Sequence, residues 1–437
     1  MPLFLPHTLT ILSTPLTSSH SLLGQAGDAA KRSINLALSV RGQSALAAVG
    51  VLETVMARAV AMPARAIHGV NAGSNVVTQA YGLPGQAIYS VSRSHINCAL
   101  LDACAQNPLI RLEFGSSLHS LSAAGELTIS QGRDGDAPTK TRPLLVIGAD
   151  GAFSAVRAAL LRNSRVDFAQ KFIRHAYKEL SLPATKNGDY ALPSPNALHI
   201  WPRGDFMLIA LPNSDHSFTC TLFAPWETFD ALDAAVDVHS GIRAFLTTHF
   251  PDAAHLIPTP EEQWKENPAS ALIEIRVTPW AQGTSPRVLI IGDAAHATVP
   301  FYGQGMNAAL EDTLCFGEAI DAANGDITTA AASFAASRGP AGTALCDLSM
   351  ANYDEMAHKT ASFWFRARAS LERTLHSIAP TFWIPLYSMV AFSRIPYHDA
   401  VRRSKRQDMI LDVCLGVTTI GVIGFTAATI WRKYLLR

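Results

Sequence analysis

The sequence is poor in charge and has no patterned cysteines. Only 16% of its 437 residues are Asp, Glu, Lys or Arg, and 35 basic residues balance 35 acidic ones. A balanced chain has no net attraction for a polyanion, which argues against nucleic acid as a partner. The six cysteines form neither a CxxC pair nor a dense framework, so no zinc site and no disulfide scaffold is predicted.

Other absences mark the two ends of the chain. No acidic residue precedes Asp28, and the early apolar runs are interrupted by prolines, so residues 1–30 resemble no targeting peptide and are expected to be irregular. No charged residue occurs from Val413 to Trp431, a run that as a helix would span about 28 Å. We predict a membrane-spanning tail anchor over residues 409–431. A buried core helix is the alternative, and basic residues on both flanks leave the orientation of an anchor open.

The 48% hydrophobic content is sufficient for a large packed core. Apolar periodicity predicts helices over 44–60 and 92–106, and helical sequence to about residue 370. Short apolar runs predict strands over 87–91, 109–114, 127–130 and 144–147, and the alternation from 172 to 223 predicts an antiparallel sheet. Because strands and helices interleave, the predicted class is an α/β core with an inserted antiparallel sheet.

The stretch "VLIIGDAAHATVPFYGQGMNAALED", residues 288–312, couples a buried strand to an acidic turn. Such a turn presents Asp293 at the carboxyl end of the strand, where α/β sheets bind ligands and a carboxylate can accept hydrogen bonds from a sugar or polyol. Downstream, Pro300 stiffens the loop, while Gly303 and Gly305 let backbone amides approach a flat or anionic group at the start of a helix. An ordinary Asp helix cap is the alternative interpretation.

A second device of this kind, "GADGAFSAVR", spans residues 148–157, where Asp150 could stabilise a turn or contact a nucleotide. The two stretches resemble the DG and GD motifs of the single-component FAD-dependent aromatic hydroxylases. Further stretches extend the resemblance over roughly residues 30–405, towards the members that act on L-kynurenine. They are "RSINLALSVRG", "MPARAIHG", "YSVSR", "LHIWPRGDFMLIALPNSDHSFTCTLFAP", "DLSMANYDEM" and "WIPLYSMVAFSRIPYHDAV".

The resemblance implies a glutathione-reductase-like, three-layer FAD-binding core, incomplete at its N-terminus, with an inserted substrate sheet, C-terminal helices and a membrane anchor. The expected units are an irregular 1–30, FAD-binding parts 31–160 and 281–340, a substrate sheet 161–280, a helical region 341–408 and the span 409–431. Location at the outer mitochondrial membrane, facing the cytosol, is also implied.

The resemblance assigns site residues by position. Those matched to cofactor contacts are Arg41, Arg93, Asp150, Asp293, Pro300, Gly303, Gly305, Met306 and Asn307. Those matched to the amino-acid end of the substrate are Arg65, Tyr81, Asn352 and Tyr387. A guanidinium fork and phenol hydroxyls suit a carboxylate.

The chemistry is implied as well. NADPH would reduce FAD, the reduced flavin would take up O2 as a C4a-hydroperoxide, and its distal oxygen would hydroxylate the kynurenine ring beside the carbon that bears the amine. The amino group activates that ring, so no catalytic side chain is predicted. His296 and His199 are interpreted as packed, hydrogen-bonded histidines.

One feature of the family is missing, because the sequence contains no GxGxxG turn. That turn, with its strand and helix, would hold the ADP half of FAD. Three explanations are open: an N-terminal sequence that is not that of the natural enzyme; a truncated, FAD-deficient, membrane-anchored protein that binds kynurenine or a partner without hydroxylating; or a different aromatic hydroxylase.

Overall fold

The computed structural model describes residues 9–13, 35–70, 76–122, 124–131, 138–235, 238–281, 286–358, 371–372 and 374–413. Most of the predicted irregular N-terminus and almost all of the predicted span 409–431 lie outside the described residues. Within the described part of the chain, no helix is long and apolar enough to cross a membrane.

A seven-stranded sheet forms the substrate side of the molecule, in the order β16-β12-β15-β14-β13-β4-β5. The predicted antiparallel sheet is present, but β4 joins β13 in parallel and was not predicted. Its strands are β4 Ala64–Ile67, β5 Val77–Ala80, β12 Asp167–Leu182, β13 Ala197–Arg203, β14 Phe206–Pro212, β15 Phe218–Pro225 and β16 Ser270–Thr278.

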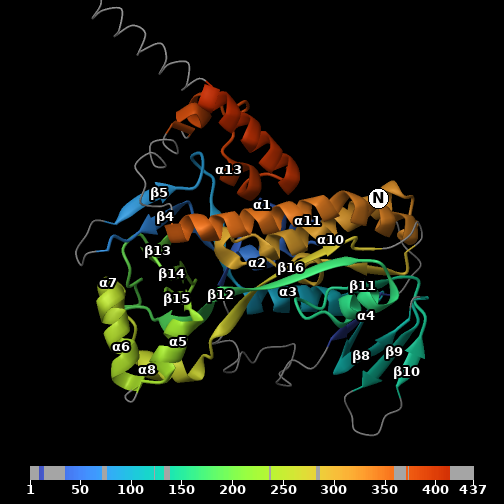
Figure 1. Ribbon diagram of the computed structural model, residues 1–437, viewed down its shortest axis with the longest axis horizontal. Helices are drawn as coiled ribbons and strands as arrows, with labels where there is room; N and C mark the ends of the chain where they lie inside the picture. Colours follow the sequence, from blue (N-terminus) through green and yellow to red (C-terminus); the bar gives the residue numbers. More distant parts are fainter. Residues whose placement is uncertain are drawn as a thin grey trace, which may run out of the picture.

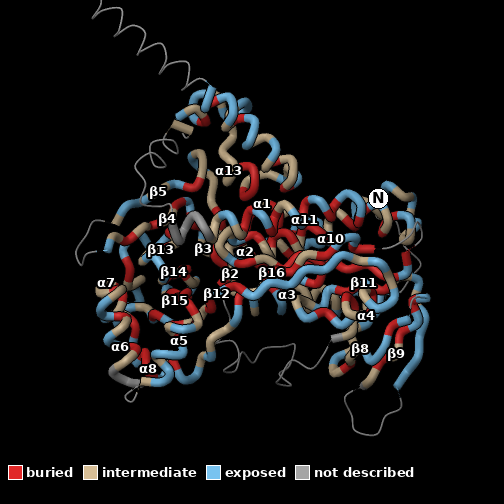
Figure 2. The backbone as a smooth tube through the Cα atoms, in the orientation of Figure 1, coloured by how far each residue is buried: buried red, intermediate tan, exposed pale blue. Residues whose placement is uncertain are grey.

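Short helices cover one face of this sheet (Figure 1). Apolar side chains of the strands and helices, among them Trp201, Phe218 and Trp264, form one buried cluster there. These helices are α5 Trp226–Asp233, α6 Val238–His249, α7 Pro251–Ala254 and α8 Pro260–Glu266. Figure 2 shows the edge strand β5 largely exposed, so β4 is the last well-covered strand at this end of the sheet.

The cofactor side is built from smaller sheets. Strands β2 Asn35–Leu38, β6 Ile88–Ser92 and β3 Val60–Met62 form one, β8 Ser116–Leu121, β9 Leu127–Gln131 and β10 Thr139–Thr141 another. Two parallel pairs are β1 Leu9–Ser13 with β7 Ile110–Phe114, and β11 Val146–Gly148 with β17 Val288–Ile290. No described strand joins these two pairs into one sheet.

Helices on this side follow the sequence prediction in part. The predicted helix 92–106 is present as α3 Arg93–Gln106. The predicted helix 44–60 is divided into α1 Val40–Ala48, α2 Leu52–Met56 and strand β3. Gly50 separates α1 from α2 with a φ of 75°, a left-handed conformation that interrupts a helix.

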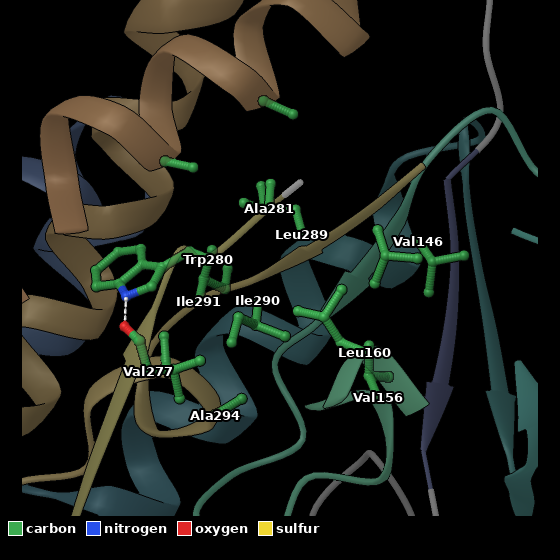
Figure 3. Close-up of a cluster of buried hydrophobic side chains, with 14 of the residues drawn as sticks. Val146, Val156, Leu160, Val277, Trp280, Ala281, Leu289, Ile290, Ile291 and Ala294 are labelled. Carbon is green, nitrogen blue, oxygen red and sulfur yellow. Dashed lines mark hydrogen bonds between the residues drawn. The ribbon is translucent and has the colours of Figure 1, made fainter. Parts of the chain in front are cut away.

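The strand pair β11–β17 lies over a buried apolar cluster (Figure 3). Leu289 and Ile290 are fully buried there, and the Trp280 indole N–H donates to the Val277 carbonyl at 3.0 Å. Because both strands are short and firmly packed, the two acidic turns that follow them start from a rigid base.

Two long helices complete the core and run side by side (Figure 1). These are α10 Gly305–Ala322 and α11 Ile327–His358. The GD turn leads through α9 Asp293–His296 and the 3-10 turn η2 Pro300–Tyr302 into α10. Earlier in the chain, α4 Ala155–Asn163 follows the DG turn. At the C-terminal end of the described chain lie α13 Leu386–Ala391 and a helix over 397–413.

Candidate cofactor and substrate site

The GD turn holds its carboxylate open to solvent at the end of β17. Gly292 has a φ of 58°, which turns the chain sharply before Asp293 begins α9. The Asp293 side chain is exposed, yet neighbouring protein removes part of its hydration and raises the pKa of the carboxyl group. The positive charge of exposed Arg93, at the start of α3, opposes that rise. Arg93 and Asp293, both predicted from the resemblance to contact FAD, therefore lie near each other.

The N-terminus of α10 is free of protein caps. Its N-cap residue Gln304 makes no side-chain capping bond, and no acidic residue lies in the first turn. The first amides of a helix have no intrahelical acceptor and carry the positive end of the helix dipole. Gly303 and Gly305 add no side chains of their own at these amides. The turn can therefore donate to electron-rich atoms of a flat ring, and together with Asp293 it fits the flavin and ribityl end of FAD.

Asn307 has a structural task in the same helix. Its side chain is fully buried, donating to the carbonyls of Ala37 and Gly303 at 2.8 and 3.0 Å and accepting from the Ser39 amide at 2.8 Å. It thus joins the Pro300–Gly305 loop to β2. Met306 is half-buried and packs on the apolar cluster beneath α1. Asn307 and Met306 therefore hold the Pro300–Gly305 loop in place through contacts with the protein interior.

Arg41 is not placed in the predicted flavin shell. Its side chain is fully buried, with Nη1 2.8 Å from both carboxylate oxygens of Glu311 and Nε 2.8 Å from the Val390 carbonyl. Its Nη2 donates to the carbonyl of Ile395. The Tyr397 ring packs against the guanidinium at 4.1 Å. With all three nitrogens committed to protein acceptors, Arg41 has a structural role.

The DG turn also carries a structural function. Asp150 accepts hydrogen bonds from the Ala155 and Val156 amides at 2.7 and 3.2 Å, capping the start of α4. Arg157 donates to the Ala294 carbonyl at 2.9 Å and so ties the DG turn to the GD turn. Of the two readings left open for Asp150, the structure contains the turn-stabilising one.

Three predicted substrate residues meet beside the α10 loop. The Tyr81 and Tyr387 rings are stacked with centroids 5.2 Å apart, and the Arg65 guanidinium lies 5.7 Å from the Tyr81 ring centre. Within the described part of the chain, the buried Nε of Arg65 has no hydrogen-bond partner. Since a buried, unpaired guanidinium nitrogen is costly, its position is suited to an external acceptor such as a carboxylate.

Burial keeps both phenols of this cluster protonated. It raises the pKa of Tyr81 to about 12, an effect that the charge of Arg65 reduces. Burial also raises the pKa of Tyr387 well above its ordinary value. Near neutral pH both hydroxyls can donate hydrogen bonds, and neither can act as a base.

Asn352 and Tyr302 connect this cluster to the cofactor loop. Asn352 donates to the Phe301 carbonyl at 2.6 Å, and the Tyr302 ring stacks near Tyr387 at 6.0 Å. Tyr302 was not predicted as a site residue, although it stands beside Pro300 within the GD motif. The aromatic residues of the "PFYGQG" loop were the available signal. Substrate and cofactor residues thus converge on one loop.

Comparison with known proteins bears on these assignments. The model of a family described as FAD binding domain matches residues 19–326. Kynurenine 3-monooxygenase of Sus scrofa is 40% identical over 386 residues, 88% of this chain and 80% of the relative. The chain belongs to the kynurenine 3-monooxygenase family. Members from Salinispora tropica (40% identical, 91% of this chain, 86% of the relative) and Caenorhabditis elegans (37%, 91% and 88%) match over similar lengths.

Solved structures support the fold. PqsL of P. aeruginosa in complex with 2-aminobenzoylacetate superposes with a TM-score of 0.61 and 17% identity, covering 80% of this chain and 90% of that one. A tetrameric form of 2-methyl-3-hydroxypyridine-5-carboxylic acid oxygenase gives 0.59 and 18%, covering 83% and 88%. The predicted mixed α/β fold of the FAD-dependent aromatic hydroxylases is confirmed.

Although the chain belongs to the kynurenine 3-monooxygenase family, it lacks the glycine-rich turn expected for FAD. The chain contains no GxGxxG, and β1 is followed by Thr14 and Pro15 rather than by glycine. The described residues therefore fit the flavin end of FAD, and we assign none of them to the pyrophosphate.

Proposed function

We propose that the chain is an FAD-dependent aromatic monooxygenase that hydroxylates L-kynurenine at ring position 3, with NADPH as electron donor and O2 as oxidant. The observation that carries this proposal is the unpaired Nε of Arg65, placed with Tyr81 and Tyr387 beside the loop that fits the flavin. The family match, which includes both acidic turns, favours this enzyme over an FAD-deficient binding protein.

The protein's own residues bind and orient the substrate. Arg65 pairs with the α-carboxylate, the protonated hydroxyls of Tyr81 and Tyr387 donate to its amino-acid end, and Asn352 holds Phe301 and with it the loop between substrate and flavin. Bound FAD supplies the redox chemistry with NADPH and O2. The buried aromatic cluster keeps water from the substrate's amino-acid end, and no side chain is required as general base.

The test combines a spectrum with product analysis. The purified chain is saturated with FAD, freed of excess, and its flavin absorption is measured. NADPH oxidation is then followed with and without L-kynurenine, and the product is identified by mass spectrometry. We expect retained flavin and kynurenine-dependent formation of 3-hydroxykynurenine. Flavin retention with hydroxylation of another aromatic compound only would favour a different hydroxylase, and absence of a flavin band would favour the FAD-deficient alternative.

We also propose that the chain docks on a bilayer, at the outer mitochondrial membrane on its cytosolic face. Large apolar side chains are exposed at the end of the described chain, with exposed fractions of 75% for Ile378, 82% for Phe382 and 67% for Met409. Arg403 donates to the Phe382 carbonyl at 3.2 Å, so the basic helix 397–413 adjoins this apolar surface. Mixed apolar and basic side chains are typical of surfaces that contact anionic lipid headgroups.

Vesicle sedimentation tests this second proposal. The chain should sediment with vesicles containing anionic lipid, and charge reversal of the exposed Arg402 and Arg406 to Glu should weaken binding when the run 413–431 is removed. The chain without residues 413–431 is compared with the same truncated chain carrying both Glu substitutions. If the two sediment equally, the basic helix has no role in binding.

A further inference from the structure

A partly buried set of hydrogen-bonded polar groups lies behind Arg65, the proposed substrate residue. Nδ1 of His68 is 2.6 Å from Oδ2 of Asp252, and its Nε2 is 2.8 Å from Nδ1 of His199. The His68 ring also stacks on Trp201 with centroids 4.0 Å apart, and Trp201 donates its indole N–H to the same Asp252 oxygen at 2.8 Å. These contacts join β4, β13 and α7 in one cluster.

The hydrogen-bond acceptors around His199 and His68 indicate which of their ring nitrogens carry hydrogen. Nε2 of His199 faces the Ser194 carbonyl at 3.3 Å, and since a carbonyl only accepts, this nitrogen carries hydrogen. Burial, with the nearby His68 charge, lowers the pKa of His199 to about 4, so the ring is neutral and its Nδ1 is a bare acceptor. Nε2 of His68 must therefore be the donor to it.

The other side of His68 faces an ionised carboxylate. Burial raises the pKa of Asp252, but hydrogen bonds from His68 and Trp201 lower it by more, so the net shift is downward. An ionised carboxylate only accepts, and Nδ1 of His68 therefore also carries hydrogen. His68 therefore lies between two hydrogen-bond acceptors, Asp252 on α7 and His199 on β13.

Two neighbouring strands of the sheet also hold β4. The strand pairs through four residues with β13 and four with β5, an edge strand whose side chains are mostly exposed. Side chains alternate along a strand, so Arg65 points to the substrate face while Ala66 and His68 point to the helix-covered face. Arg203 adds hydrogen bonds to the carbonyls of His68 and Gly69 at 3.2 and 2.8 Å. These contacts therefore hold the end of β4 that leads into His68.

We propose that His68, held between Asp252 and His199, is a positioning residue for substrate binding: it fixes β4 so that the Arg65 guanidinium stays aligned with the substrate carboxylate. This inference rests on the proposed function. A bidentate guanidinium–carboxylate pair is sensitive to small displacements, so loosening β4 should weaken this one interaction more than any other contact to the substrate.

The test measures substrate affinity by calorimetry on the FAD-saturated chain. In His68→Gln the amide cannot donate in both directions, and in Asp252→Asn the carboxylate partner is removed. Both variants should weaken L-kynurenine binding at least tenfold, which is about 1.4 kcal/mol. Binding of the decarboxylated analogue of kynurenine should change less than twofold. If His68→Gln does not fold, Asp252→Asn alone decides, since its side chain is 37% exposed.

Two comparisons separate positioning from general loosening. Combining His68→Gln with Arg65→Gln should add no further loss to that of Arg65→Gln alone, because both changes remove the same interaction. The control Arg243→Gln breaks the 2.6 Å ion pair with Glu261 between α6 and α8, in the same helical layer but away from β4. It should bind both ligands like the wild-type chain.

The outcomes distinguish this inference from the proposed function. A wild-type chain that does not bind L-kynurenine would overturn the function itself. The wild-type chain could instead bind L-kynurenine while the variants lose affinity for L-kynurenine and its decarboxylated analogue equally, or for neither. That result would overturn only the positioning role of His68.

Discussion

At the scale of single residues, Arg65 is the side chain on which the proposed substrate recognition depends. Its buried Nε has no hydrogen-bond partner among the described residues, so we expect the ligand to satisfy it. Hydrogen bonds to charged groups contribute about 1.5–3 kcal/mol, and Arg65→Gln should therefore weaken L-kynurenine binding by about tenfold or more. Titration of the flavin spectrum with substrate measures this change.

The control for this prediction is an arginine elsewhere in the sheet. Arg174 lies on β12 and makes a surface ion pair with Glu227, 3.4 Å away, where the two side chains are 57% and 67% exposed. Arg174→Gln should leave substrate affinity unchanged. Unaltered binding by Arg65→Gln would refute the assignment of the guanidinium to the carboxylate.

His199 makes the stability of the fold depend on pH. Its pKa is about 4 in the folded chain against 6.5 ordinarily, so between these values the unfolded chain binds a proton that the folded chain does not. The contribution of neutral His199 to the free energy of unfolding is therefore present well above pH 6.5 and is lost as the pH falls towards 4. The lowered pKa of Asp252 acts in the same direction at still lower pH. From pH 6.5 to 5 the His199 contribution to the loss is about 2 kcal/mol.

Urea unfolding at several pH values checks this prediction. His199→Gln should be less stable at pH 7 but should lose less of its stability between pH 6.5 and 5. The exposed His255→Gln should keep the wild-type dependence. An unchanged acid loss in His199→Gln would exclude His199 as its source.

The residue pattern alone predicted the two acidic turns, whereas Arg65, Tyr81 and Tyr387 were singled out only by the family resemblance. A glycine–aspartate turn after an apolar strand has one geometry, so Asp293 could be placed beforehand. Arg41 could not, because its partner Glu311 is 270 residues away and buried with it. Only tertiary packing decides whether such an arginine faces a ligand or a carboxylate.

At the scale of elements, a buried charge network fixes α10 against its neighbours. Glu311 pairs with Arg41 at 2.8 Å and with Arg338 of α11 at 2.7 Å, and Arg338 also pairs with Asp312 at 2.7 Å. Asp312 in turn lies 2.6 Å from His296 in α9. One network therefore joins α1, α9, α10 and α11 behind the cofactor loop.

Breaking this network should destabilise the fold rather than remove a cofactor contact. Removing one partner of a buried ion pair typically costs about 3–5 kcal/mol, so Arg41→Met should lower the urea midpoint strongly. Arg402→Met, which affects an exposed pair with Asp399, should have little effect. Normal stability of Arg41→Met combined with weakened FAD binding would instead restore Arg41 to the flavin shell.

Element boundaries followed local signals, and element pairing did not. The helix 92–106 and the strands around 88–91 and 110–114 were predictable from apolar periodicity, and Gly50 explains why the predicted helix 44–60 is divided. The parallel pairing of β4 with β13 joins segments more than 130 residues apart, Ala64 opposite Ala197. No local pattern encodes that pairing, yet it places His68 beside His199.

At the scale of the whole molecule, the chain combines a flavin-fitting end with no recognisable pyrophosphate turn. Asp293, Arg93 and the α10 N-terminus form the part of the site that we propose holds the flavin end, which FAD and FMN share. The GxGxxG turn, which in related folds places a helix N-terminus under the pyrophosphate, is not in the sequence. Most of the binding free energy should therefore come from the part of the cofactor that FMN also contains.

We accordingly predict that this chain discriminates weakly between the two cofactors, with dissociation constants for FAD and FMN within about tenfold of each other. Quenching of flavin fluorescence during titration gives both constants. Asp293→Ala should weaken FAD and FMN binding alike, because the carboxylate would contact the shared ribityl end. A preference for FAD of a hundredfold or more would mean that residues of this chain hold the adenosine half without a glycine-rich turn.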